Sequence, residues 1–334
     1  MSQMNRRELF EHMGTAVIAT SLGRTQAGGQ ITEAVGPSRF LPGFTVSRVQ
    51  TSGTIVEGAK GAIQTMGTSI HVTAGGDGPP LLVLHGAPMT HITWRLIAPQ
   101  LAKSYTVIAP DLRGYGDSGK PPDGDEHANY SKRVMARDQI EVMRHFGFTR
   151  FPVVGHDRGG RVGHRLALDH PETVTKLAVL DILPTYYLYT HVTLDFVRAY
   201  FHWFNYLRDA PGPENELKAQ YEARSARAST DVQKEYARAM SDPAAIHAMC
   251  EDYRAGASID LKHDETDLRQ GKKVTCPLLT LWGERGAMGR LYDVLDVWRD
   301  WGAQVSGKSL PAGHNLPEEI PDAVLTELLA FLRA

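Results

Sequence analysis

An aspartate with a glycine two residues away on either side, Asp157, is the side chain in this sequence best placed to act as a nucleophile. It lies in Gly155-His-Asp-Arg-Gly-Gly-Arg161, after the apolar run 151–155 and before 162–168, which has helical spacing. A strand, a sharp glycine-flanked turn and a helix form a nucleophile elbow, whose strained turn projects one side chain into a cleft. A carboxylate at that position is ionised near neutral pH and can displace a leaving group from a tetrahedral carbon, whereas serine would attack a carbonyl.

The aspartyl ester that such a displacement forms must be hydrolysed, which requires a base and an acid that orients it. In elbow-bearing folds the nucleophile, the acid and the histidine follow in that chain order. His314, in a glycine-containing loop after the last expected strand, is therefore the predicted base. The acid is Asp181, at the end of the strand after the elbow, or Glu284, after the next strand. We favour Asp181, because an acidic residue inside an apolar run is costly to bury without a partner.

Two arginines beside the elbow indicate what the substrate carries. Arg158 and Arg161 lie three residues apart at the start of the expected helix, so they share a face. Guanidinium groups at a helix N-terminus form a binding site for a carboxylate. For Arg161 alone, a structural ion pair with a nearby acid is the alternative. The backbone N–H groups of Ala87, in the His-Gly-Ala-Pro turn, and of Arg158 are the expected donors to the oxyanion of ester hydrolysis.

The elements that must position these residues alternate between apolar β-type runs and helical segments. This alternation predicts a mostly parallel central sheet with helices on both faces. A helix capped by Ser131 is expected to run to about His145, and residues 53–67 are expected to form a loop or a hairpin. Strands are expected at 81–85, 105–110, 151–155, 177–181, 277–283 and, more weakly, 304–310, and a closing helix at 323–332.

A long segment without obvious strands interrupts this alternation. Residues 184–269 are rich in aromatic, alanine and charged residues with helical spacing. We predict a helical cap there, inserted between two parts of one α/β core, 43–183 and 270–334. Such a lid excludes water from the cleft and adds side chains from above. Residues 1–42 are predicted to be an N-terminal extension, of which 28–42 form a linker.

Composition excludes several classes of partner. The chain has 334 residues, 42% of them hydrophobic and 22% charged, which is enough for a substantial core. A net charge of −2 gives no reason to expect nucleic acid as a partner. Cys250 and Cys276 lack metal-ligand spacing and are expected to be free thiols. We predict neither a metal nor a cofactor.

The first residues resemble an export signal. Asn5-Arg-Arg-Glu-Leu-Phe10 precedes a short, weakly apolar stretch, 13–22, as in twin-arginine signals. This pattern predicts a periplasmic or exported protein, and a cytoplasmic protein with an N-terminal extension is the alternative. The apolar stretch is too short to span a membrane, and no membrane partner is expected.

Together, these motifs resemble the fluoroacetate (haloacetate) dehalogenases of the α/β-hydrolase superfamily. The similarity covers roughly residues 43 to 334, and beyond the elbow it is carried by 127–131, 167–171, 180–186, 200–203, 242–247 and 252–255. The resemblance implies an α/β-hydrolase fold with an inserted helical cap. It also implies the cofactor-independent hydrolysis of short 2-haloacids to 2-hydroxy acids, by an enzyme that is often a homodimer.

The resemblance also implies a role for each site residue. Asp157 is the implied nucleophile, Asp181 and His314 complete the triad, and Arg158 and Arg161 bind the substrate carboxylate. A halide pocket is implied for three cap residues whose imidazole, indole and phenol groups are hydrogen-bond donors: His202, Trp203 and Tyr253.

The sequence departs from that family at two positions. Ala87 and Asn315 stand where the family commonly has phenylalanine. The loss of an aromatic ring next to an oxyanion donor predicts a wider pocket and a tolerance of bulkier 2-haloacids, or weaker activity on fluoroacetate.

An epoxide hydrolase is the main alternative function. It shares the aspartate elbow and the His-Gly-x-Pro turn, and needs paired cap tyrosines to protonate the epoxide oxygen. The predicted cap is rich in tyrosine, so composition does not exclude this function, but Arg158 argues against it because that family usually has an aromatic residue there. A haloalkane dehalogenase is disfavoured because its substrate is uncharged. The intact set of Asp157, Asp181 and His314 disfavours a binding protein without turnover.

Overall fold

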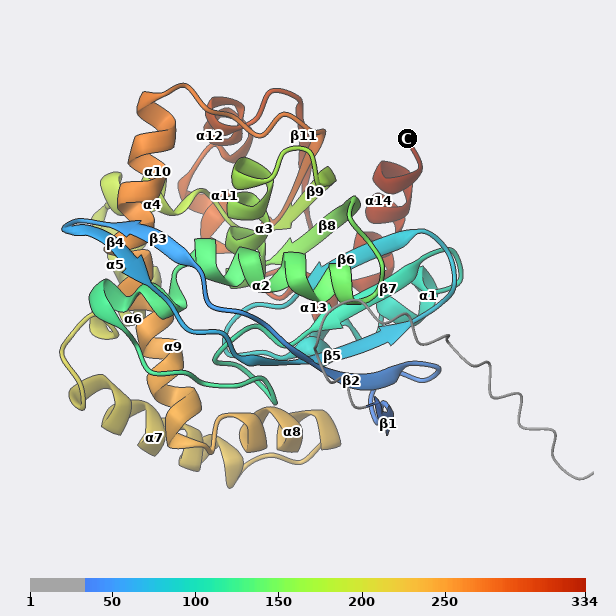
Figure 1. Ribbon diagram of the computed structural model, residues 1–334, viewed down its shortest axis with the longest axis horizontal. Helices are drawn as coiled ribbons and strands as arrows, with labels where there is room; N and C mark the ends of the chain where they lie inside the picture. Colours follow the sequence, from blue (N-terminus) through green and yellow to red (C-terminus); the bar gives the residue numbers. More distant parts are fainter. Residues whose placement is uncertain (1–33) are drawn as a thin grey trace, which may run out of the picture. The chain divides into compact units, whose positions relative to one another are not determined.

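A nine-stranded sheet lies at the centre of residues 34–334, the part of the chain described by a computed structural model (Figure 1). The strand order is β1-β2-β5-β7-β6-β8-β9-β10-β11. The pairs from β7 through β6 to β11 are parallel, whereas β1, β2 and β5 are antiparallel. The strands are β1 (Ala34–Pro37), β2 (Thr45–Gln50), β5 (Ser69–Gly75), β6 (Pro80–Leu84), β7 (Thr106–Pro110), β8 (Phe151–His156), β9 (Val174–Leu180), β10 (Leu278–Gly283) and β11 (Val305–Leu310).

Both faces of the sheet are covered, as predicted. Leu82 and Leu84 of β6 belong to one apolar cluster, and Leu81 and Val83 to another, because successive side chains of a strand point to opposite faces. The first cluster includes side chains of α2, α3 and α12, and the second includes those of α14. The core helices are α1 (Ala98–Leu101), α2 (Lys132–His145), α3 (Arg158–Asp169), α11 (Ala287–Leu291), α12 (Val294–Trp301), α13 (Leu316–Glu319) and α14 (Pro321–Arg333), with the 3-10 turns η1 (His91–Trp94) and η2 (Asp125–Tyr130).

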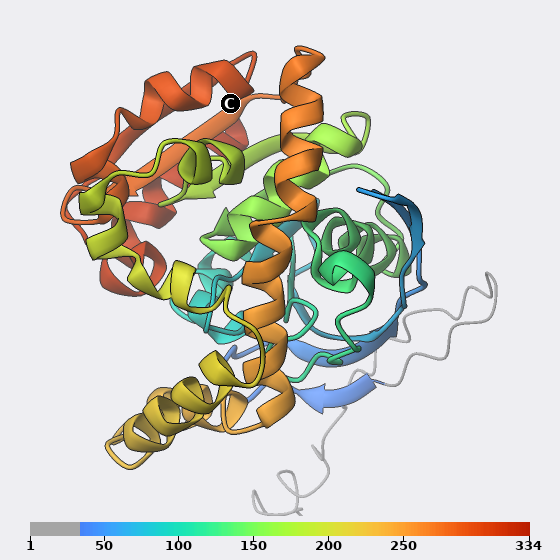
Figure 2. The ribbon, with the colours of Figure 1, turned by 90° about the vertical axis from the view of Figure 1, so that its left-hand side faces the viewer.

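A purely helical segment follows β9 and ends before β10, which confirms the predicted inserted cap. Figures 1 and 2 show α9 and α10 following one another along one side of the sheet, with α7 and α8 at the far end of α9. The domain boundaries 184–269 stay a prediction. The cap helices are α4 (Thr185–Thr190), α5 (Leu194–Ala199), α6 (Phe201–Asn205), α7 (Gly212–Ser225), α8 (Asp231–Ala239), α9 (Pro243–Gly256) and α10 (Ile259–Arg269).

Local predictions hold in most places. Ser131 caps α2, because its hydroxyl accepts a hydrogen bond from the N–H of Val134. Residues 53–67 contain a hairpin of β3 (Ile55–Gly58) and β4 (Gly61–Gln64), which touches the cap through a bond between His263 and the Glu57 carbonyl. Cys250 and Cys276 are free thiols, as expected.

The predicted linker differs from the structure at its end. Ala34–Pro37 pairs with β2 across a register shift and forms the edge strand β1. The glycine and proline content of this stretch concealed the strand, although both residue types are tolerated at an edge or a bulge. The predicted export signal lies outside the described residues. Among residues 34–334, no helix is long and apolar enough to cross a membrane.

Candidate active site

The predicted nucleophile elbow is present between β8 and α3. Asp157 has φ 46° and ψ −118°, a backbone conformation that L residues rarely adopt. Glycine on either side lets the chain turn this sharply. A Cβ atom at Gly155 would lie 2.5 Å from the Gly159 carbonyl oxygen, and one at Gly159 would lie 2.5 Å from the Leu84 carbonyl oxygen. The sharp turn therefore depends on both glycines.

The two oxygen atoms of the Asp157 carboxylate face different groups. The Ala87 N–H donates to Oδ1 at 2.9 Å, while Oδ2 lies 3.9 Å from Nε2 of His314. Burial alone would raise the pKa of Asp157, but His314, His156 and Arg158 hold it well below its ordinary range. Asp157 is therefore ionised. No hydrogen bond from the Arg158 N–H, the second predicted oxyanion donor, to this carboxylate is found among the described residues.

Asp181, and not Glu284, is the acid that contacts His314. Its Oδ2 lies 2.6 Å from Nδ1 of His314, and its Oδ1 accepts the Gly283 N–H at 2.9 Å. Glu284 instead accepts a hydrogen bond from the Ser309 hydroxyl. Burial would lower the pKa of His314, but the bond to Asp181 and the charge of Asp157 raise it. The three predicted residues are thus brought together, with His314 between the two carboxylates.

Arg158 and Arg161 are both buried and keep donors without a protein partner. No nitrogen atom of the Arg158 side chain makes a hydrogen bond within the described chain, although its Nε lies 3.4 Å from Oδ2 of Asp252. Arg161 donates through Nη1 to the Leu183 carbonyl and the Thr185 hydroxyl, each at 3.0 Å, and its Nε is unpartnered. Burial and the charge of Arg158 lower the pKa of Arg161. An anion between these cations would relieve both their repulsion and their unmet hydrogen bonds.

Two of the three aromatic residues predicted to hold a halide pack against these arginines. The Cζ atom of Arg158 lies 3.5 Å from the ring centroid of Tyr253, and that of Arg161 lies 4.7 Å from the ring of Trp203. The ring of His202 lies 6.0 Å from that of Tyr253, and burial lowers the pKa of His202 to about 4, so its imidazole is neutral. Within the described chain, the donors of all three side chains make no hydrogen bond. These donors are therefore available to bind an anion.

A buried ionic network behind Arg158 was missed by the sequence reasoning. Asp252 accepts the Tyr115 hydroxyl at 2.6 Å, is bonded by the Lys132 ammonium, and faces Arg158. Asp260 lies 3.5 Å from Lys132 Nζ and accepts the Lys132 N–H at 2.8 Å. The only sequence signal was the place of Asp252 next to Tyr253.

Two further side chains at the site were also missed. Tyr189 packs against Trp203, with ring centroids 5.4 Å apart, and its buried hydroxyl has no partner within the described chain. His156, next to Asp157, is bonded through Nε2 to the His314 carbonyl at 2.9 Å. Burial lowers the pKa of His156 to about 4, so the side chain that fixes the His314 loop is uncharged.

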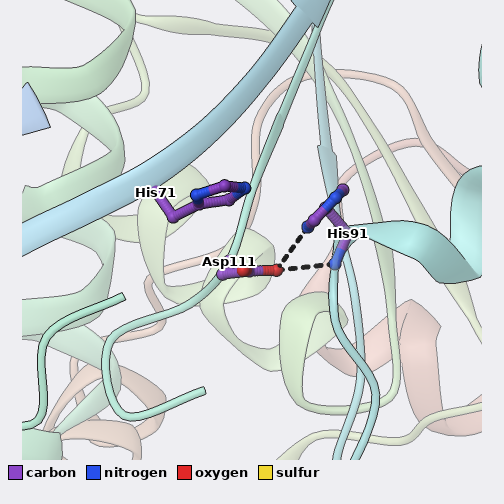
Figure 3. Close-up of side chains that lie close together, drawn as sticks. All are labelled: His71, His91 and Asp111. Atoms are coloured by element: carbon purple, nitrogen blue, oxygen red, sulfur yellow. Dashed lines mark hydrogen bonds and ion pairs between the residues drawn. The ribbon is translucent and has the colours of Figure 1, made fainter. Parts of the chain in front are cut away.

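Another buried cluster has the composition of a metal site. Ligand atoms of His71, His91 and Asp111 lie within 4.8 Å of one another (Figure 3). Asp111 Oδ1 already accepts the N–H and Nδ1 of His91, and Oδ2 accepts the Asp117 N–H. Protein donors satisfy the Asp111 carboxylate, whereas Nε2 of His71 is buried without a hydrogen-bond partner in the described chain. The cluster links the loop that follows the Ala87 turn to the end of β7.

Comparison with known proteins finds relatives of this chain with two different activities. Residues 79–321 match the family described as alpha/beta hydrolase fold. A fluoroacetate dehalogenase from a Burkholderia species is 46% identical over 276 residues, covering 79% of this chain and 90% of the relative. A soluble epoxide hydrolase from Corynebacterium sp. (strain C12) is 33% identical over 286 residues, covering 79% and 94%. A solved structure from Nostoc sp. PCC 7120, assigned to the α/β hydrolases, is 49% identical with a TM-score of 0.76, covering 84% and 97%.

Proposed function

This chain belongs to the α/β-hydrolase family and is an enzyme of the haloacetate dehalogenase type, and we propose that it hydrolyses short 2-haloacids to 2-hydroxy acids. The observation that carries this proposal is the ionised Asp157 beside two buried arginines with unpartnered donors. A substrate carboxylate satisfies these donors, whereas an uncharged epoxide or haloalkane leaves them buried and unpaired.

In the first step, Arg158 and Arg161 hold the carboxylate and orient C2 toward Asp157. Oδ2 of Asp157 attacks C2 from the side opposite the halogen, forming a carbon–oxygen bond as the carbon–halogen bond breaks. The halide leaves with the bonding electrons. Donors of three cap side chains stabilise it, because a fixed dipole in a water-poor site costs no reorganisation as charge develops: His202, Trp203 and Tyr253.

In the second step, His314 removes a proton from water, and the hydroxide attacks the carboxyl carbon of Asp157. The oxyanion forms at Oδ1, where the Ala87 N–H already donates. Asp181 stabilises the imidazolium. Protonated His314 then returns its proton to the departing alkoxide, which leaves as the 2-hydroxy acid, and Asp157 regains a carboxylate. The overall reaction consumes one water and releases one halide ion and one proton.

Halide release and trapping of the ester test this proposal directly. Purified protein is incubated with fluoroacetate, chloroacetate and bromoacetate, and released halide and glycolate are measured by ion chromatography. We expect His314→Gln to stop turnover and to accumulate an ester on Asp157, visible as added mass on the peptide that contains it. Asp157→Asn should give neither halide nor adduct, and His170→Gln, away from the site, should turn over normally.

The isotope pattern of the first turnover gives a second readout. In water labelled with oxygen-18, a single turnover should yield unlabelled glycolate, because the transferred oxygen comes from Asp157. Labelled glycolate in that turnover, or normal turnover by His314→Gln, would overturn the covalent mechanism.

Epoxide hydrolysis is the second candidate, and one observation favours it. The hydroxyls of two cap tyrosines, Tyr189 and Tyr253, make no hydrogen bond within the described chain, and both rings pack against Trp203. A pair of tyrosine hydroxyls is what an epoxide oxygen requires. Turnover of styrene oxide without halide release from any haloacetate would select this function.

A further inference from the structure

A cavity of about 430 Å³ lies between the cap and the loops that carry the site. Its volume falls within the range of small-molecule binding sites. The core part of its wall includes Pro88, Met89 and Asn315. The cap part comes from α7, α8 and the residues beside them, and includes Tyr221, Tyr236 and Met240.

Two lining residues of the cavity directly follow site residues along the chain. Pro88 directly follows Ala87, whose N–H lies 2.9 Å from Oδ1 of Asp157. Asn315 directly follows His314, whose Nε2 lies 3.9 Å from Oδ2 of Asp157. Ala87, next to the lining residue Pro88, and Asn315, which is itself in the lining, carry a small and a polar side chain rather than an aromatic ring.

The wall is suited to an apolar ligand. Met89 and Met240 supply flexible thioether chains that adapt to an alkyl group. The polar tip of Tyr236 is engaged elsewhere, because its hydroxyl donates to Glu318 at 2.8 Å. The hydroxyl of Tyr221 points to the sulfur of Met249, 4.0 Å away. Apart from the polar side chains of Arg224, Arg227, Gln233 and Asn315, the wall that remains for a ligand is largely hydrocarbon.

The substituents at C2 of the substrate indicate which group the cavity would bind. C2 of a 2-haloacid carries four groups: the carboxylate, the halogen, hydrogen and a side chain. The proposed reaction directs the carboxylate to Arg158 and Arg161 and the halogen toward Trp203, which leaves the side chain to exit elsewhere. We propose that this cavity is a subsite for the C2 alkyl chain of a 2-haloalkanoate longer than 2-halopropionate. This inference rests on the function proposed above.

Two cations at the cavity support an anionic substrate. Arg224 and Arg227 are exposed and contribute to its lining, and neither side chain forms an ion pair with a described acid. The Cζ atom of Arg224 lies 5.4 Å from the ring centroid of Tyr221. Unpaired positive charge beside a cleft raises the local concentration of anions and their rate of entry.

A chain-length series tests the subsite. Bromide release is measured for 2-bromopropionate, 2-bromobutyrate and 2-bromohexanoate with the full-length protein. Each methylene that the cavity takes from water should raise kcat/KM about threefold to fourfold, so 2-bromohexanoate should exceed 2-bromopropionate by on the order of thirtyfold. Water plus substrate gives 2-hydroxyhexanoate, bromide and a proton.

Filling the cavity should abolish this preference. Ala237 is a half-buried lining residue of α8. In Ala237→Trp, the ratio of kcat/KM for 2-bromohexanoate to kcat/KM for 2-bromopropionate should fall close to one. Asn315→Phe narrows the cavity from the core side and should lower the same ratio if the first variant fails to fold. Ala219→Trp places the same side chain at an exposed position of α7 outside the lining and should keep the wild-type ratio.

The possible results distinguish a failure of the proposed subsite from a failure of the proposed dehalogenase function. Release from bromoacetate without any gain along the series, or an unchanged ratio in folded Ala237→Trp and Asn315→Phe, would overturn the subsite and leave the dehalogenase function intact. No bromide from bromoacetate or any member of the series would overturn the proposed function itself.

Discussion

The core and cap sides of the site are held by different kinds of interaction. On the core side, backbone groups hold the reacting residues at strand ends: the Asp157 N–H bonds the Leu180 carbonyl, and the Gly283 N–H bonds Asp181. On the cap side, Trp203 and Tyr253 are held by ring packing and by buried guanidinium groups. Backbone bonds at adjacent strands tolerate little movement, whereas packed side chains can be exchanged.

This difference assigns separate tasks to the two halves. In the proposed mechanism core groups carry out the chemistry, since the base must lie within hydrogen-bond reach of the acid that orients it and of the water that it deprotonates. Cap groups are proposed to bind the halide, and they can vary without disturbing the sheet. We therefore expect core variants to reduce kcat and cap variants to change KM or the preference among halogens.

The largest effect is expected from Asp181→Asn on the core side. Loss of the carboxylate removes the partner that orients His314 and stabilises its protonated form, so kcat should fall on the order of 10³–10⁴-fold. The measurement is steady-state halide release with chloroacetate. Glu284→Gln, at the exposed runner-up position, is the matched control and should keep wild-type kcat.

The pH profile sharpens the same comparison. His314 acts as a base when neutral, and its pKa is raised above the ordinary value of about 6.5. The wild-type rate should therefore fall as pH drops through that raised pKa. Asp181→Asn removes the main cause, so its residual activity should persist to lower pH. If the acidic limb of the pH–rate profile is the same in Asp181→Asn and wild type, the role assigned to Asp181 is wrong.

A smaller effect is expected where the two halves meet, in Arg158→Lys. Lysine keeps the charge but cannot reproduce the planar donor fork, so KM for chloroacetate should rise about tenfold to a hundredfold with a smaller change in kcat. Initial-rate kinetics over a wide substrate range separate the two constants. Arg208→Lys, on the exposed cap surface, should leave both unchanged. A comparable fall in kcat at constant KM would show that Arg158 acts in the chemical step and not in substrate binding.

A cap variant, Tyr253→Phe, should discriminate between halogens. Loss of one donor to the departing ion matters most for fluoride, a poor leaving group with concentrated charge. We expect turnover of fluoroacetate to fall about tenfold or more and that of bromoacetate to change less than about threefold. The neighbouring Tyr206→Phe, whose ring lies 5.0 Å from Tyr253, is the control. Equal losses on both substrates would show that the hydroxyl does not serve the halide.

The comparison also explains what could be predicted from the sequence. The elbow around Asp157 and the turn at Ala87 are runs of contiguous residues, so their local geometry follows from residue type. The choice between Asp181 and Glu284 depended on which strand end faces His314, which only the sheet register decides. The network at Asp252 joins residues 137 and 120 positions apart, through Tyr115 and Lys132, and no local pattern marks such pairs.

The smallest expected effect, on stability, comes from that network. Burial raises the pKa of Asp260 to about 6, although Lys132 opposes this. The folded state therefore binds this proton more tightly than the unfolded state, where Asp titrates near about 3.9. The stabilisation is complete below about pH 4 and is lost as pH rises through about 6.

Asp260→Asn keeps an acceptor for the Lys132 N–H and removes the titration, so it should weaken the fall of Tm between pH 5 and pH 8. Thermal unfolding followed by circular dichroism across that range is the measurement. At pH 8 the variant should melt at the wild-type temperature or a few degrees above it. Asp252→Asn is the contrasting variant, since it leaves Arg158 and Lys132 short of a buried counter-charge and should lower Tm throughout. A pH dependence identical in Asp260→Asn and wild type would mean that Asp260 stays ionised beside Lys132.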